Sequence, residues 1–205
     1  MSKYKLGIIG GSGLYDLKKF TNAKYIDVTT AWGKPSDQII SFKHKGKEIF
    51  FLPRHGKKHN IQPSFINYRA NIDALKQLGV TDIISFSAVG SLNDAIKPGM
   101  FVVPDQFIDR TYKRANTFFD SDIVCHVSMS KPISESLMET CINALKEIGL
   151  DFIDKGTYIA IEGPQFSTHS ESKGYKLCGA DVIGMTNMPE AKLAREAEIR
   201  YATIG

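Results

Sequence analysis

Two short segments near the start of the chain contain residues that could bind an anion. Gly10-Gly11-Ser12-Gly13 follows a short apolar run; its glycines let the backbone approach a ligand closely, and Ser12 adds a hydroxyl donor. Arg54 and His55 follow a second apolar run, and an arginine beside an imidazole can hold a phosphate through several hydrogen bonds. Each segment alone also fits a glycine turn without a ligand or a solvated Arg-His pair. His59, in a basic stretch, is predicted to lie on the surface.

The glycine segment does not match the two common nucleotide-binding motifs. The dinucleotide fingerprint needs a third glycine at the start of a helix, but Gly11-Ser12-Gly13 is followed by Leu14-Tyr15-Asp16. No Gly-Lys-Ser/Thr sequence follows either, as a P-loop requires. The sequence therefore argues against a nicotinamide-dependent oxidoreductase and against a P-loop nucleotidase.

A small-residue loop follows the apolar run at residues 82–86. It reads Ser87-Ala88-Val89-Gly90, at the carboxyl end of a predicted strand, where the ligands of α/β sheets gather. Ser87 and the N–H groups after it could complete a phosphate cradle. Close packing of small residues between strand and loop explains the same pattern, so the alternative stays open.

Two further loops, at residues 162–168 and 184–190, each follow a predicted strand and precede a predicted helix. Phe166 in the first loop offers a plane on which a base can stack, and Met185 in the second offers a soft apolar contact for a sugar. Either side chain could equally belong to the apolar core.

Strands and helices alternate along the chain, which predicts an α/β layered fold. Apolar runs bounded by glycine or polar residues predict strands at 6–9, in a meander within 25–52, and at 82–86, 157–161, 182–183 and 199–204. Helical spacing and end signals predict helices at 67–78, 134–148, 169–178 and 189–198. In the helix at 134–148, Leu137, Cys141, Leu145 and Ile148 form the predicted buried stripe. Without an internal repeat or linker, residues 1–205 are expected to form one domain.

Composition indicates a soluble, cytoplasmic protein. Of the 205 residues, 42% are hydrophobic and 23% charged, and the net charge of +4 is scattered, which gives little reason to expect nucleic-acid binding. Three cysteines without close pairing argue against a disulfide framework and a zinc knuckle. No apolar run has the length of a membrane span or a signal segment, so no membrane partner is expected.

Taken together, the segments resemble the purine nucleoside phosphorylase family, in particular its methylthioadenosine branch. The resemblance runs from Gly7 to Ile204 and depends on several motifs in the right order, an arrangement more specific than any one of them. The motifs are Gly10-Gly11-Ser12-Gly13, Pro53-Arg54-His55-Gly56, Asn67-Tyr68-Arg69-Ala70-Asn71, Ser87-Ala88-Val89-Gly90-Ser91-Leu92, Pro104-Asp105-Gln106-Phe107, Gly163-Pro164-Gln165-Phe166-Ser167-Thr168 and Gly184-Met185-Thr186.

The resemblance implies a three-layer α/β/α fold with a central mixed sheet, and a homo-oligomer that is a trimer or a dimer of trimers. It implies a ribose contact for Met185, a base contact for Phe166, and a role for His126 in the neighbouring subunit's 5′ pocket. It also implies a set of phosphate-binding residues: Ser12, Arg54, His55, Ser87, Ala88 and Thr186. The implied partners are a nucleoside and inorganic phosphate as co-substrate, with no metal or organic cofactor.

The implied reaction is phosphorolysis of 5′-methylthioadenosine to adenine and 5-methylthioribose 1-phosphate. Ser167 supports a 6-aminopurine, because the 6-oxopurine branch of the family has a carboxylate here that accepts a hydrogen bond from N1–H. Adenine N1 is an acceptor, to which a serine hydroxyl can donate. A mismatched buried polar pair costs about 1–3 kcal/mol, enough to set a preference. A 6-oxopurine nucleoside phosphorylase remains the alternative.

The sequence departs from the family pattern in three places. Gln165 and His169 replace two arginines that are usual there. The family also has an acidic pair that grips the purine shortly after the strand at 199–204, whereas the sequence ends at Gly205. The resemblance therefore predicts a chain shortened at its C-terminus and inactive or nearly so by itself. A non-enzymatic nucleoside-binding fragment is the second alternative.

Overall fold

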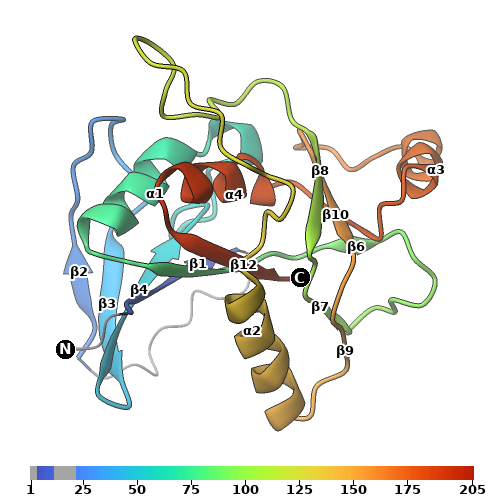
Figure 1. Cartoon of the computed structure of the whole chain (residues 1–205), viewed down its shortest axis with the longest axis horizontal. Coiled ribbons are helices and arrows are strands. Elements are labelled where there is room, and N and C mark those ends of the chain that lie inside the picture. Colours follow the sequence, from blue (N-terminus) through green and yellow to red (C-terminus); the bar gives the residue numbers. More distant parts are fainter. Residues whose placement is uncertain (1–3, 12–21) are drawn as a thin grey trace.

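The computed structural model describes residues 4–11 and 22–205 (Figure 1). Its largest sheet is mixed and six-stranded. The strand order is β12-β5-β1-β4-β3-β2. The first four strands in this order run parallel, while β3 and β2 form the antiparallel meander that the sequence predicts. The strand bounds are β1 (Leu6–Gly10), β2 (Lys24–Ile26), β3 (Ile39–His44), β4 (Lys47–Pro53), β5 (Asp82–Phe86) and β12 (Arg200–Ile204).

A smaller sheet lies beside the first one. Its order is β6-β11-β10-β8, in which β11, β10 and β8 are parallel and β6 is antiparallel. Two backbone hydrogen bonds between Val102 and Gly205, 2.9 and 2.8 Å long, connect the end of β12 to β7. The bounds are β6 (Gly90–Ser91), β8 (Gln106–Arg110), β10 (Thr157–Ile161) and β11 (Val182–Gly184), with a parallel pair β7 (Phe101–Val102) and β9 (Phe152–Ile153).

Four α-helices cover these sheets in the described part of the chain: α1 (Tyr68–Gln77), α2 (Glu135–Glu147), α3 (His169–Leu177) and α4 (Asn187–Glu196). Figure 1 shows α1 and α4 side by side on one side of β12, with α2 on the other. The α/β/α expectation is therefore confirmed, and the strands in residues 4–11 and 22–205 form three hydrogen-bonded sheets.

Local sequence signals explain where the helices begin and end. The Asn67 side chain accepts from the Ala70 N–H at the start of α1, and Gly79, with φ +78°, follows its end. The Thr168 side chain and Glu171 form a capping box at the start of α3. The prediction for Ile148 is wrong: it is 66% exposed, because α2 ends at Glu147 and the side chain lies beyond the buried stripe.

None of the helices in residues 4–11 and 22–205 is both long and apolar enough to cross a membrane.

Candidate functional site

A cavity of about 740 Å³ lies where loops from both sheets meet. Strand ends explain its position, because the loops after β1, β4, β5, β10 and β11 leave the carboxyl ends of parallel strands. One end of the cavity is polar, lined by Gly11, Arg54, His55, Ser87, Ala88 and Thr186. The other end is more apolar, lined by Ile161, Phe166, Ser167, Ile183 and Met185.

Eight residues that the sequence singles out therefore share one cavity, although they come from four loops, after β4, β5, β10 and β11. Ser12 lies outside the described residues, but its neighbour Gly11 lines the polar end. His126 does not line this cavity; it is exposed in the segment 111–133, which has no helix or strand and projects from the sheets in Figure 1. Its proposed contact with a second subunit stays a prediction.

Arg54 is fully buried at the polar end and is held by three neighbours. Its Nε donates to Glu190 Oε2 over 2.7 Å, and its Nη2 donates to Glu190 Oε1 over 3.0 Å and to Ser85 Oγ over 2.5 Å. Nη1 donates to the Phe86 carbonyl over 3.0 Å. An arginine has five N–H groups, so this network within the described residues uses four and leaves one on Nη1.

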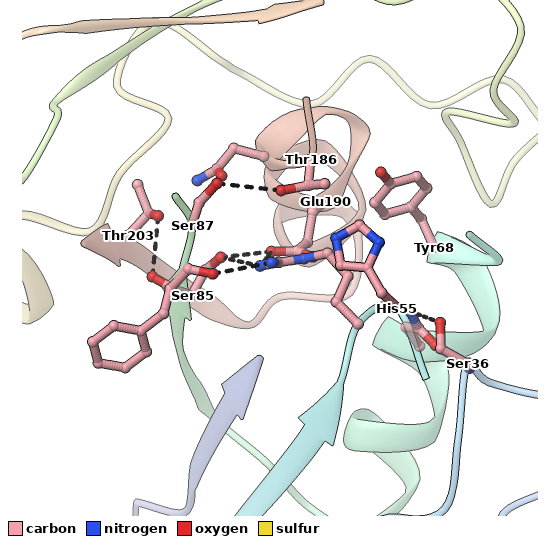
Figure 2. A network of polar contacts seen from close by, with 12 residues as sticks. Ser36, His55, Tyr68, Ser85, Ser87, Thr186, Glu190 and Thr203 are labelled. Atoms are coloured by element: carbon pink, nitrogen blue, oxygen red, sulfur yellow. Dashed lines mark hydrogen bonds and ion pairs between the residues drawn. The ribbon is translucent and has the colours of Figure 1, made fainter. Parts of the chain in front are cut away.

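Glu190 provides the negative charge that Arg54 needs in this buried position. It is itself fully buried and also accepts from Ser85 Oγ over 2.8 Å (Figure 2). It accepts from the Tyr201 hydroxyl over 2.8 Å as well. Burial disfavours the charged guanidinium, but the Glu190 carboxylate outweighs burial and raises the pKa of Arg54. Sequence reasoning missed Glu190 as the partner of Arg54.

The glycine before Ser12 lies against this arginine. A Cβ at Gly11 would lie 3.2 Å from Arg54 Nη1 and 3.1 Å from the Phe86 carbonyl oxygen. A side chain there would press on the guanidinium, so glycine allows the loop after β1 to approach the arginine closely.

His55 is buried beside Arg54 with a defined ring orientation. Its Nδ1 lies 2.8 Å from the Ile61 carbonyl oxygen, which only accepts, so Nδ1 carries the proton. Burial lowers the pKa of His55 below its ordinary value. The hydrogen bond to the Ile61 carbonyl raises this pKa, but Arg54 and His59 lower it again, so the net shift is downward. A neutral ring therefore has Nε2 as an acceptor, and a protonated ring has Nε2 as a second donor.

His59 is exposed, as predicted, but it also lines the cavity. Its ring centroid lies 4.5 Å from that of His55. The chain turns back between the two histidines, and the Ile61 N–H donates to the His55 carbonyl over 3.2 Å. The sequence alone indicated only a basic surface stretch here.

Two hydroxyl groups complete the polar end. Ser87, after β5, and Thr186, after β11, are both buried, and their hydroxyl oxygens lie 3.4 Å apart (Figure 2). Ala88 beside them is exposed and lines the cavity. Its methyl group forms no hydrogen bonds, so it does not compete with the two hydroxyls for a ligand. Hydroxyls and N–H groups therefore gather at this end, as an anion requires.

Arg114, which sequence reasoning missed, holds the two loops of the apolar end together. Its Nη1 donates to the carbonyl oxygens of Met185 and Met188, and its Nη2 donates to those of Ile161 and Glu162. The side chain is buried, and its Nε lies 3.6 Å from Glu162 Oε1. One arginine thus fixes the loop that carries Phe166 relative to the loop that carries Met185.

Phe166 and Ser167 lie at the rim of the apolar end. Phe166 is 88% exposed, so its ring face is open to a ligand. The Ser167 hydroxyl lies 2.8 Å from the Ser172 hydroxyl, and either can be the donor. If Ser172 donates, Ser167 keeps its own proton for a ligand.

Comparison with known proteins identifies the family of this chain. The family model described as the phosphorylase superfamily matches residues 5–204. The S-methyl-5′-thioadenosine phosphorylase of Thermofilum pendens is 51% identical over 204 residues, which are 100% of this chain and 78% of that protein. The protein of the same name from Hyperthermus butylicus is 54% identical over 98% of this chain and 74% of its own length.

Solved structures give the same result. The methylthioadenosine phosphorylase from Schistosoma mansoni in complex with adenine superimposes with a TM-score of 0.95 at 40% identity, covering 98% of this chain and 80% of that one. The complex of that enzyme with tubercidin has the same TM-score, identity and coverage. With a family model matched from residue 5 to 204 and relatives half identical along its length, the chain belongs to the phosphorylase superfamily.

Proposed function

We propose that this chain provides the phosphate and nucleoside cavity of an enzyme that cleaves 5′-methylthioadenosine with inorganic phosphate, giving adenine and 5-methylthioribose 1-phosphate. Relatives about half identical to it carry the name S-methyl-5′-thioadenosine phosphorylase, and a similar solved structure holds adenine. The observation that carries the proposal is the cavity itself, which joins a donor-rich end to an apolar end with an exposed aromatic ring.

The reaction exchanges one bond at the anomeric carbon. The bond from this carbon to the purine nitrogen breaks, its electron pair leaves with the purine, and a phosphate oxygen forms the new bond. The sugar passes through a cation-like state, as in glycoside hydrolysis. The protein's task is then to hold a multiply charged anion next to this carbon and to stabilise its position.

The donor-rich end suits that task. The Arg54–Glu190 pair is neutral as a unit, so the phosphate is held by individual donors rather than by a large net charge. We assign these donors to the remaining Nη1 N–H of Arg54, the hydroxyls of Ser87 and Thr186, the N–H of Ala88, and His55, whose Nε2 donates when the ring is protonated. Ser12, outside the described residues, is included on the family resemblance.

The apolar end suits the nucleoside. Phe166 is proposed to stack on the base and Met185 to contact the ribose. Ser167, with Ser172 as its hydrogen-bond partner, is proposed to donate to adenine N1. Arg114 serves this end by keeping the two loops in register.

We also propose a homo-oligomer, a trimer or a dimer of trimers, in which His126 reaches the cavity of a neighbouring subunit. Large apolar side chains that are exposed at residue 65 and in the segment 111–133 support this, since exposed apolar patches mark interfaces. They are Phe65 at 75%, Tyr112 at 76%, Ile123 at 66% and Val124 at 75% exposure.

A cytoplasmic location and a reaction without metal or organic cofactor complete the proposal. Cys125 and Cys178 are free and exposed, which suits a reducing compartment. Phosphate is the co-substrate, and the donors at the polar end supply the stabilisation that the reaction needs.

Equilibrium binding tests the proposal directly. Isothermal titration calorimetry would measure the binding of phosphate, adenine and hypoxanthine to the 205-residue chain. Adenine and hypoxanthine would each be titrated with and without phosphate. We expect phosphate binding and a clear preference for adenine. Tighter binding of hypoxanthine would support the 6-oxopurine alternative, and absence of phosphate binding would overturn the proposal. Any release of adenine from 5′-methylthioadenosine must also require phosphate, because release without it would indicate a hydrolase.

A further inference from the structure

Tyr158 places a third hydroxyl behind the two that line the polar end of the cavity. The residue lies in β10, is fully buried, and does not line the cavity itself. Its hydroxyl oxygen is 3.3 Å from Ser87 Oγ and 3.4 Å from the backbone nitrogen of Thr186. Tyr158 therefore touches both residues that we assign to phosphate without reaching the ligand.

The direction of these hydrogen bonds follows from the proton count. The Thr186 N–H can only donate, so the Tyr158 oxygen accepts from it. The Tyr158 proton is then free to point at Ser87 Oγ. With this bond made, Ser87 donates its own proton over 3.4 Å to the Ala88 carbonyl, a long contact that a phosphate oxygen can replace.

We propose that Tyr158 is a positioning residue for phosphate: it turns the Ser87 hydroxyl into a donor that faces the anion and fixes the backbone of Thr186 beside it. The inference rests on the proposed function, since it concerns the same anion. A phosphate oxygen needs donors, and a hydroxyl that already accepts from Tyr158 presents its proton rather than its lone pairs. Hydrogen bonds of this length in active sites often tighten when the substrate complex forms.

The glycine at position 184 supports this role. A Cβ there would lie 2.0 Å from the Tyr158 hydroxyl oxygen and 2.5 Å from the ring carbon that bears it. Gly184 is paired with Ala160 in the register of β10 and β11, so the tyrosine hydroxyl fills the space of the missing side chain. Phe107 packs against the tyrosine ring in a T-shaped contact, with 5.7 Å between the ring centroids, and holds it in place.

The Tyr158→Phe variant removes only the hydroxyl and keeps the ring. We expect its phosphate Kd, measured by calorimetry, to rise about three- to tenfold, which corresponds to about 0.6–1.4 kcal/mol. The adenine Kd should stay within about twofold, because the hydroxyl acts at the other end of the cavity. Because Tyr158 acts through Ser87, the Tyr158→Phe substitution should weaken phosphate binding far less in the Ser87→Ala variant than in the wild-type chain.

Tyr175→Phe is the matched control, since Tyr175 is a partly buried tyrosine of α3 outside the cavity. It should leave both dissociation constants unchanged. An unchanged or lower phosphate Kd in Tyr158→Phe overturns the inference. The inference is also overturned if Tyr158→Phe and Ser87→Ala lower phosphate affinity independently, so that their effects multiply in the double variant. Equal losses of affinity for phosphate and adenine would overturn it too, since they would indicate general damage to the fold. Absence of phosphate binding by the wild-type chain would instead overturn the proposed function.

Discussion

Replacing Glu190 with glutamine removes the carboxylate that faces the buried guanidinium of Arg54. The carboxylate accepts four hydrogen bonds, two from Arg54 and one each from Ser85 and Tyr201. Glutamine has nearly the same shape, but one of its two polar ends is an NH₂ group that can only donate. Some of these donors would then face another donor, and the guanidinium would keep its charge without compensation inside the protein.

The expected loss of stability is large. Breaking a buried ion pair by removing one partner costs about 3–5 kcal/mol. For a chain of this size each kcal/mol lowers Tm by about 2–4 °C, so Glu190→Gln should lower Tm by about 6–20 °C. Phosphate affinity should fall with it, because Arg54 loses the contact that orients its remaining N–H.

Thermal unfolding followed by circular dichroism would measure this effect. Glu135→Gln is the matched control, because Glu135 also pairs with a cation, Lys131, over 2.7 Å but on the surface, and we expect no measurable change in its Tm. A Tm for Glu190→Gln within about 1–2 °C of the wild type would refute the reasoning, since it would mean that the buried charge has other compensation.

Three further outcomes are expected. His55→Asn should flatten the pH dependence of stability. The pKa of His55 is lowered in the folded chain, so the unfolded chain takes up a proton first, and the wild type loses stability relative to the variant as pH falls below about 6.5. Urea unfolding at pH 5.5 and 7.5 checks this, and the same pH dependence in both proteins would contradict it. Arg114→Lys should weaken adenine binding about tenfold and phosphate binding much less, since one ammonium cannot reach the carbonyls of both loops. Calorimetry with both ligands tests this, and equal losses of affinity for adenine and phosphate would count against the role of Arg114. Gly11→Ala should weaken phosphate binding about tenfold, because the new Cβ would lie 3.2 Å from Arg54 Nη1 and push the guanidinium aside. The phosphate Kd from calorimetry tests this, and an unchanged Kd would show that Arg54 tolerates the added methyl group.

The order of strands and helices could be predicted from the sequence because each apolar run ends at residues with strong local preferences. The run at 157–161 is β10 as observed, and Gly79 and Gly149, both with positive φ, follow α1 and α2 and were part of the end signals for the helices predicted at 67–78 and 134–148. The motif loops were found for a related reason: they follow strands, and the carboxyl ends of parallel strands meet at one edge of a sheet.

The partners of the buried charges could not be predicted, because they are distant in sequence. Arg54 and Glu190 are 136 residues apart, and Arg114 is 71 residues from Met185. A signal existed for Glu190, which precedes Leu193 and Ala194 by three and four residues and so shares their buried face of α4. A carboxylate on an apolar helix face needs a buried partner. Arg114 gave no such signal, since residues 111–133 have no periodic pattern.

The central claim is that loops from both sheets converge on one oxyanion, and a crystal structure of the chain with phosphate tests it most directly. We predict a phosphate with oxygens about 2.6–3.2 Å from Arg54 Nη1, Ser87 Oγ and Thr186 Oγ1 together. A phosphate bound elsewhere, or one that contacts none of these three atoms, would contradict the account.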